Sequence, residues 1–135
     1  HRKVVYDQKL DLILAGIEGS LRYSHQPHQY SQARMWWMVL GLIPGLLRNK
    51  LLRGRYLDVF VTHSAPEGIQ DEKDLPHRGI KAFRWLIKTF KPQLHLHGHI
   101  HLYTPLIPWK SRFKQTLVVN AYGYREIPWP LPENW

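Results

Sequence analysis

The sequence contains no cysteine among its 135 residues, and its 10 acidic side chains are outnumbered by 19 lysines and arginines. The absence of cysteine excludes disulfide bonds, thiolate metal ligands and thiol redox chemistry, and it leaves the cytoplasm as the default expectation. Long hydrophobic runs are also lacking. The most apolar stretch, residues 35–47, is shorter than the roughly 18 residues of a membrane span. No signal peptide is visible, and the start at His1 instead of Met indicates trimming or an origin in a longer chain.

The shortage of acidic residues gives the chain a formal net charge of +9. Such a charge favours nucleic acid, anionic membranes or phosphorylated substrates as partners. The basic residues are nevertheless spread over three groups, in residues 48–55, 81–91 and 110–114. Solvated helix faces and loops explain such a distribution equally well, so both interpretations stay open.

Apolar patterning predicts alternating strands and helices. Strands are expected at residues 4–6, 10–17, 56–62, 94–97 and 116–120, with a hairpin arm at 101–109 and an irregular tail at 127–135. Helices are expected from an N-cap at Ser31 to residue 40, over residues 45–52 after Pro44, and over residues 79–90. Buried strands that alternate with helices predict the α/β class and a layered sandwich, and the length suits a single domain.

Four of the nine histidines alternate along His95-Leu-His-Gly-His-Ile-His101. In an extended chain, side chains at positions i and i+2 lie on the same face, so the segment predicts a row of imidazoles. Neutral imidazole offers a free lone pair near pH 7 and is the commonest metal ligand. The alternative is a polar edge strand whose histidines contact only water or backbone.

Polar side chains also follow three of the predicted strands. His63 follows the strand at 56–62, His99 and His101 follow the strand at 94–97, and Asn120 ends the strand at 116–120. Functional residues gather at the carboxyl ends of strands in α/β sheets, so these side chains are candidates for one site. Imidazoles suit Zn, Fe, Mn, Co or Cu.

Carboxylates are the missing part of that site. A two-metal hydrolytic centre holds its cations about 3.5–4 Å apart, which normally requires a bridging carboxylate. No Asp or Glu stands at an obvious ligand spacing beside a strand end. The acids Glu67, Asp71 and Asp74, in the loop after His63, are interpreted as solvated.

Four segments carry a resemblance to a known family. They are Asp58-Val-Phe-Val-Thr-His-Ser-Ala-Pro66, His97-Gly-His-Ile-His101, Val118-Val-Asn120 and Gly16-Ile-Glu-Gly-Ser-Leu-Arg-Tyr23. Together they resemble the carboxyl-terminal half of the calcineurin-like metallophosphoesterases. The amino-terminal motifs of that family, Asp-x-His, Gly-Asp and Gly-Asn-His-Asp/Glu, do not occur in this sequence.

The resemblance implies part of a layered αββα sandwich, with a mixed sheet flanked by helices and a dinuclear centre of divalent Mn, Fe, Zn or Co. It implies that His63 and His99 bind one metal and that His101 binds the other. Asn120 matches a position near the site, and His97 is expected to be structural or to support the ligands. We call residues 16–23 the glycine-rich segment. Arg22 of this segment is expected to attract an anionic substrate.

These expectations define residues 1–135 as a single partial domain, the carboxyl-terminal portion of a metal-dependent phosphoesterase. The complete enzyme would hydrolyse phosphomonoesters or phosphodiesters with metal-activated water. The chain alone is expected to be inactive, and the missing half would come from upstream sequence or from a partner chain. The alternative is a non-catalytic basic module that binds nucleic acid or a protein partner.

Overall fold

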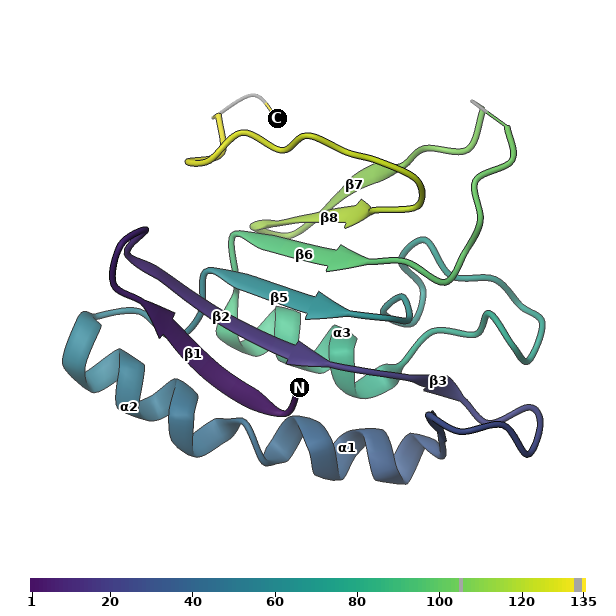
Figure 1. Cartoon of the computed structure of the whole chain (residues 1–135), viewed down its shortest axis with the longest axis horizontal. Helices are drawn as coiled ribbons and strands as arrows, with labels where there is room; N and C mark the ends of the chain where they lie inside the picture. Colours follow the sequence, from purple (N-terminus) through teal and green to yellow (C-terminus); the bar gives the residue numbers. More distant parts are fainter. Residues whose placement is uncertain (105, 133–134) are drawn as a thin grey trace.

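The computed structural model describes residues 1–104, 106–132 and 135. Along the chain, four strands are followed by two helices, a strand, a third helix and three more strands (Figure 1). They are β1 (Lys3–Asp7), β2 (Leu12–Ile17), β3 (Ser20–Leu21), β4 (Gln29–Tyr30), α1 (Gln32–Leu40), α2 (Ile43–Arg53), β5 (Val59–Thr62), α3 (Lys81–Phe90), β6 (Leu94–His97), β7 (Lys110–Phe113) and β8 (Thr116–Asn120). No helix in this described part of the chain is long and apolar enough to cross a membrane.

Six strands form a mixed sheet in the order β1-β2-β5-β6-β8-β7. The four central strands run parallel, and β1 and β7 pair antiparallel at the two outer positions. The two short strands β3 and β4 pair with each other beside the main sheet. The carboxyl ends of the parallel strands therefore meet at one edge of the sheet (Figure 1).

The helices cover one face of the sheet. The buried core on that face joins strand residues such as Ile13 and Phe60 to Met35 of α1, Leu46 of α2 and Phe83 of α3. A smaller cluster on the other face is covered by the chain near the carboxyl terminus instead of by a helix. It comprises Leu12, Val59, Leu94, Leu117 and Val119, with Trp109, Ile127, Leu131 and Trp135 packed against it. The α/β class and the mixed sheet are confirmed, with all three helices on the same side.

Local sequence signals explain the helix boundaries. The Ser31 hydroxyl accepts the Arg34 amide at 3.1 Å, which confirms the predicted N-cap of α1. Pro44 lies in the first turn of α2, and Gly54 ends that helix in the left-handed conformation with a φ of 73°. Proline suits a first turn because its missing N–H is not needed there, and glycine adopts positive φ without a steric cost.

Two expectations about extended chain are wrong. Between residues 101 and 109, the described residues form no strand, and the hairpin arm begins only at Lys110. Residue 105 lies outside the described residues, but Pro108 cannot donate a ladder hydrogen bond, which favours a later start. The row of imidazoles is also interrupted, because β6 ends at His97 and His99 has a φ of 67°.

Candidate metal centre

The first two histidines of the row are part of the core. His95 is fully buried, its ring lies 5.1 Å from the Phe60 ring, and its Nε2 is 3.3 Å from the Thr62 hydroxyl. That hydroxyl donates to the Ser64 carbonyl, so it accepts from His95. Burial holds the pKa of His95 well below its ordinary value, and the ring is neutral.

His97 is similarly enclosed. Burial lowers its pKa to about 4, although a backbone hydrogen bond from its ring to the Gly98 carbonyl opposes the shift. Its Nε2 lies 2.8 Å from Oε1 of the Gln70 side chain. His97 thus contacts the Gly98 backbone and the Gln70 side chain, and it supports the neighbouring loop.

His63 and His99 meet at the carboxyl edge of the sheet. They follow the adjacent parallel strands β5 and β6, and their ring centroids are 4.7 Å apart. The Gly98 amide donates to the His63 carbonyl at 3.0 Å, which ties the two strand ends together. His99 occupies the left-handed region, a conformation that costs a non-glycine residue roughly 1–3 kcal/mol and is common at functional sites.

Both rings can offer a nitrogen lone pair. His99 Nε2 lies 2.8 Å from the Pro76 carbonyl, and because a carbonyl only accepts, Nε2 carries the proton. The neutral ring then has its lone pair on Nδ1. Desolvation, with a smaller contribution from the neighbouring His99, lowers the pKa of His63 and favours its neutral form. The pair is therefore suited to a cation.

A cavity of about 470 Å³ opens beside this pair. His63 and His99 line it together with Gly19, Ser20 and Tyr23 of the glycine-rich segment. The Ser64 hydroxyl donates to the Gly19 carbonyl at 3.1 Å and fixes that segment against the end of β5. The segment therefore forms a wall of the candidate site.

Two other predicted site residues, His101 and Arg22, have different neighbours. The ring of His101 stacks on Tyr122 with 4.5 Å between centroids, and its Nδ1 lies 2.8 Å from the Tyr103 hydroxyl. Among the described residues, neither His63 nor His99 is a ring neighbour of His101. Arg22 lines an adjacent cavity, together with Arg78 and Lys81.

Asn120 is buried and has a structural task. Its amide nitrogen donates to the Ile100 carbonyl at 2.8 Å, and its amide oxygen accepts the Tyr122 N–H at 2.9 Å. The side chain thus links the end of β8 to the chain that follows His99. Both of its side-chain hydrogen bonds are to backbone groups, so it supports the chain beside His99.

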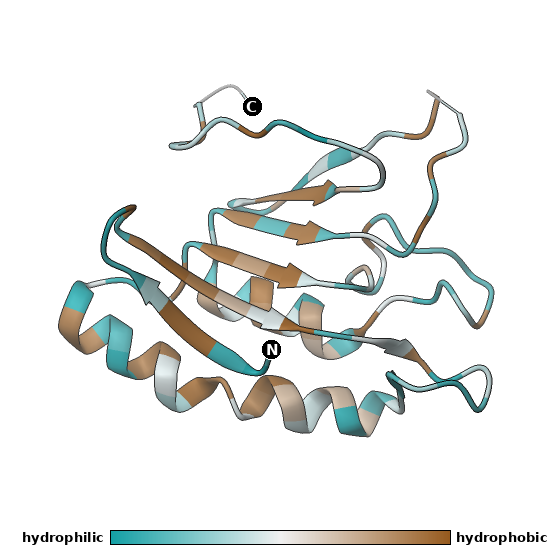
Figure 2. Cartoon of the chain, viewed as in Figure 1, coloured by the Kyte–Doolittle hydropathy of each residue, from teal (hydrophilic) through white to brown (hydrophobic). Residues whose placement is uncertain are grey.

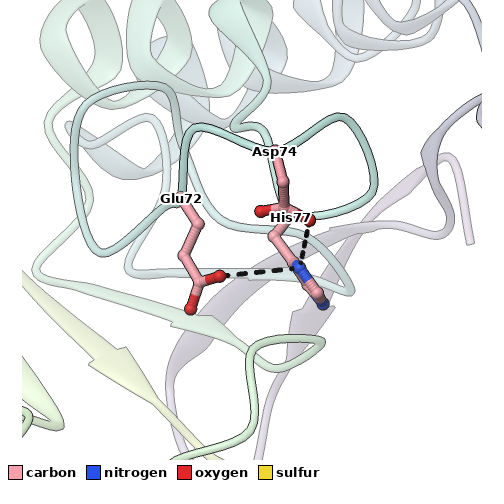
Figure 3. A group of neighbouring side chains, drawn as sticks. All are labelled: Glu72, Asp74 and His77. Carbon is pink, nitrogen blue, oxygen red and sulfur yellow. Dashed lines mark hydrogen bonds and ion pairs between the residues drawn. The ribbon is translucent and has the colours of Figure 1, made fainter.

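Sequence reasoning missed a group of candidate ligands in the loop between β5 and α3. His77 Nδ1 lies 2.7 Å from a carboxylate oxygen of Asp74 and 3.6 Å from one of Glu72 (Figure 3). The potential ligand atoms of these three residues all lie within 4.8 Å of one another. The His77 ring is 5.2 Å from the His99 ring, so this group adjoins the His63–His99 pair.

The loop is closed at its base, which fixes the position of this group. The Ile80 amide donates to the Ala65 carbonyl at 2.9 Å, and the Glu72 amide donates to the His77 carbonyl at 3.2 Å. A Cβ atom at Gly79 would lie only 2.4 Å from the Glu67 Cα, so glycine is needed at this neck. The spacing Asp74-x-x-His77 was the one signal in the sequence that could have indicated the group.

Comparisons with known proteins show the fold and no more. No protein-family profile and no curated protein sequence matches the chain. The crystal structure of TT1561 of Thermus thermophilus is similar, with a TM-score of 0.55 and 18% identity, over 90% of this chain and 48% of that one. A second crystal structure is similar with a TM-score of 0.57 and 17% identity, over 90% and 44% of the two chains. The chain thus spans about half the length of each.

Proposed function

We propose that this chain is the carboxyl-terminal portion of a metal-dependent phosphoesterase that hydrolyses phosphomonoester or phosphodiester bonds. The observation that supports it most is the meeting of His63 and His99, from adjacent strand ends, in a cavity beside the glycine-rich segment. Enzymes of the α/β class bind their ligands at the carboxyl edge of a parallel sheet. The two imidazoles lie at that edge. The resemblance to calcineurin-like metallophosphoesterases supports the same reaction.

The residues present fit one cation better than two. The group of Glu72, Asp74 and His77 offers two oxygens and one nitrogen at separations that a single ion of the Zn or Mn type can bridge. Within residues 1–104, 106–132 and 135, no carboxylate completes the His63–His99 pair in the same way. A second cation at the pair would therefore need a further ligand, either the Glu18 carboxylate that lines the same cavity or a group from outside the described residues.

A divalent cation held at the carboxyl edge of the sheet would polarise a phosphate ester and supply a nucleophilic water near neutral pH. The chain's own residues have simpler tasks. His63 and His99 present lone pairs, and the Pro76 carbonyl holds the His99 ring in one tautomer. The guanidinium groups of Arg22 and Arg78, in the adjacent cavity, attract an anionic substrate.

The full layered sandwich and its second half are part of the same proposal. The described chain has helices on one sheet face only, and its solved structural neighbours are about twice as long. We expect the remaining layers and the first metal's carboxylates to come from further sequence or from a partner chain. An Asp-x-His, a Gly-Asp and a Gly-Asn-His in frame upstream of His1 would support the first source. Their absence from the gene, together with no co-purifying chain that carries them, would contradict the proposal.

Manganese titration followed by NMR of the histidine rings tests the metal site. We expect Mn²⁺ to broaden the ring signals of His63, His99 and His77 first, and His63→Ala to weaken apparent binding by at least about tenfold. His25→Ala, at an exposed position that does not itself line the cavity, is the matched control and should leave the apparent Mn²⁺ affinity unchanged. Uniform broadening of all histidines, unaffected by His63→Ala, would rule the site out. Two tightly bound metals per chain would contradict the half-site.

A further inference from the structure

A second surface, on the outer side of α1 and α2, has no role in the proposed hydrolysis. Large apolar side chains project from it into solvent. They are Trp37 at 70% exposure, Leu40 at 38%, Leu47 at 53%, Leu51 at 85% and Leu52 at 58%. We call these residues, with Arg34 and Arg48, the outer α1–α2 face.

The spacing places these side chains away from the core. In α1 the buried residues are Met35, Met38 and Val39, and in α2 they are Leu46 and Asn49. The exposed positions 34 and 37 lie one turn apart in α1, and positions 47, 48 and 51 share one side of α2. The two helices follow each other along one side of the molecule, with apolar residues on both (Figures 1 and 2). Together they present an extended surface that α3 and the sheet do not cover.

The charge of this region has a single sign. Residues 19–57 contain no Asp or Glu, whereas they contain six Arg and Lys. Several of these cations are held by the protein itself, such as Arg55 by Asp58 and Asp11, and Arg53 over the Tyr6 ring. Among the described residues, Arg34 and Arg48 form no ion pair. Both flank the exposed Trp and Leu side chains.

We propose that the outer α1–α2 face docks on the surface of an anionic lipid bilayer. Helices that lie in the membrane interface combine Trp and Leu on one side with Arg and Lys that reach the headgroups. An arginine stem can also lie along apolar surface while its guanidinium contacts phosphate. Nucleic acid would use the cations but would leave Leu47 and Leu51 unburied, because leucine neither stacks on bases as aromatics do nor hydrogen-bonds to them. This inference is independent of the proposed phosphoesterase activity.

Sedimentation with lipid vesicles tests the proposal on the whole chain. We expect binding to vesicles of phosphatidylcholine with roughly 30% phosphatidylglycerol, which gives the surface a moderate negative charge. We expect little binding to pure phosphatidylcholine. Binding should weaken as salt is raised. The double variant Leu47→Ser/Leu51→Ser should reduce binding by at least about tenfold, since it removes the buried apolar area.

Two matched variants separate this surface from general effects. Leu106→Ser changes a leucine that is 89% exposed but lies outside the outer α1–α2 face, and it should leave vesicle binding unchanged. Arg48→Glu should weaken binding more than Lys114→Glu, in the turn between β7 and β8. Far-UV circular dichroism confirms that each variant is folded. Brominated lipids should quench the fluorescence of Trp37, and Trp37→Phe should remove that part of the quenching.

Three results would overturn the proposal. One is equal binding to charged and uncharged vesicles, or binding to neither. Another is a concentration-dependent dimer that the Leu47→Ser/Leu51→Ser variant abolishes, which would assign the face to a second copy of the chain. The third is a salt-sensitive gel shift with nucleic acid that Arg48→Glu removes and that the leucine variant leaves intact, without vesicle binding.

Discussion

The two edges of the central sheet treat charged and titratable groups in opposite ways. At the amino edge, Asp58 is 3% exposed and accepts the Ile13 amide at 2.8 Å and the Arg55 Nε at 3.0 Å. Arg55 also reaches the Asp11 carboxylate. Every strong interaction there is internal to the protein, so the amino edge is structural.

At the carboxyl edge, the corresponding groups are left open. His63 and His99 line a cavity, and the carboxylates of Glu72 and Asp74 are about half exposed beside His77. His99 is held in a costly backbone conformation by its neighbours. At the amino edge the charged groups bind one another, which is typical of a structural network. At the carboxyl edge the side chains line a cavity or face solvent, which is typical of a site for a ligand.

The largest effect is expected at the amino edge. Asp58→Ala should lower the free energy of unfolding by about 3 kcal/mol, because it strips a buried carboxylate from Arg55 and from the Ile13 amide. Urea denaturation measures the loss, and Mn²⁺ binding at the other edge should be unchanged. Asp11→Ala, which breaks only the exposed part of the network, is the control and should cost much less. Equal losses from both variants would erase the contrast.

The strand interior gives the next effect, which depends on pH. Burial lowers the pKa of His97 to about 4 and that of His95 well below its ordinary value of 6.5. Between those pKa values the unfolded chain binds more protons than the folded one, so the stability contributed above pH 6.5 is lost as the pH falls toward 4. Protonation linked to His97 alone should lower the free energy of unfolding by about 2 kcal/mol between pH 7 and pH 5.

Urea denaturation at several pH values between 7 and 4.5 measures this loss. His97→Leu should flatten the curve in that range, because the substituted side chain has no proton to bind. His25→Leu, at an exposed position, is the control and should leave the shape of the curve unchanged. A wild-type curve that stays level down to pH 4.5 would contradict the burial of both rings.

The smallest effect on stability is expected at the carboxyl edge. His99→Gly should keep the free energy of unfolding unchanged or raise it by up to about 1 kcal/mol, because glycine adopts the positive φ of this position without strain. The same variant should lose the Mn²⁺-induced broadening of the His63 ring. Thermal denaturation and NMR measure the two quantities, and His101→Gly is a comparison outside the pair. A marked loss of stability would show that His99 is a structural residue like His95.

Much of the fold follows from local patterns in the sequence. The buried runs of β2, β5, β6 and β8 and the amphipathic pattern of α3 were predicted to within a few residues. The hairpin strand expected over residues 101–109 is wrong. Its residues favour an extended chain, but the pairing with β8 begins only at Lys110. Whether an extended segment joins a sheet depends on partners that the local pattern does not contain.

The candidate site was predictable only in part, for the same reason. Strand ends in a parallel sheet meet at one edge, so the proximity of His63 and His99 follows from topology. His77 and Asp74 approach them because a loop folds back and closes on its own backbone, as the bond from the Glu72 amide to the His77 carbonyl shows. Interpreting the loop acids as merely solvated left out this closure.

The narrow neck of that loop, where Gly79 passes against Glu67, also matters for how such a sequence can diverge. Two backbone hydrogen bonds join the chain that leaves β5 to the start of α3, one from the Ile80 amide to the Ala65 carbonyl and one from the Glu67 amide to the Ile80 carbonyl. The exposed residues 72–75 can therefore change in composition while the sheet and helix on either side stay in register. Substitutions in this loop can therefore change which side chains lie near the strand ends without altering the sheet or α3.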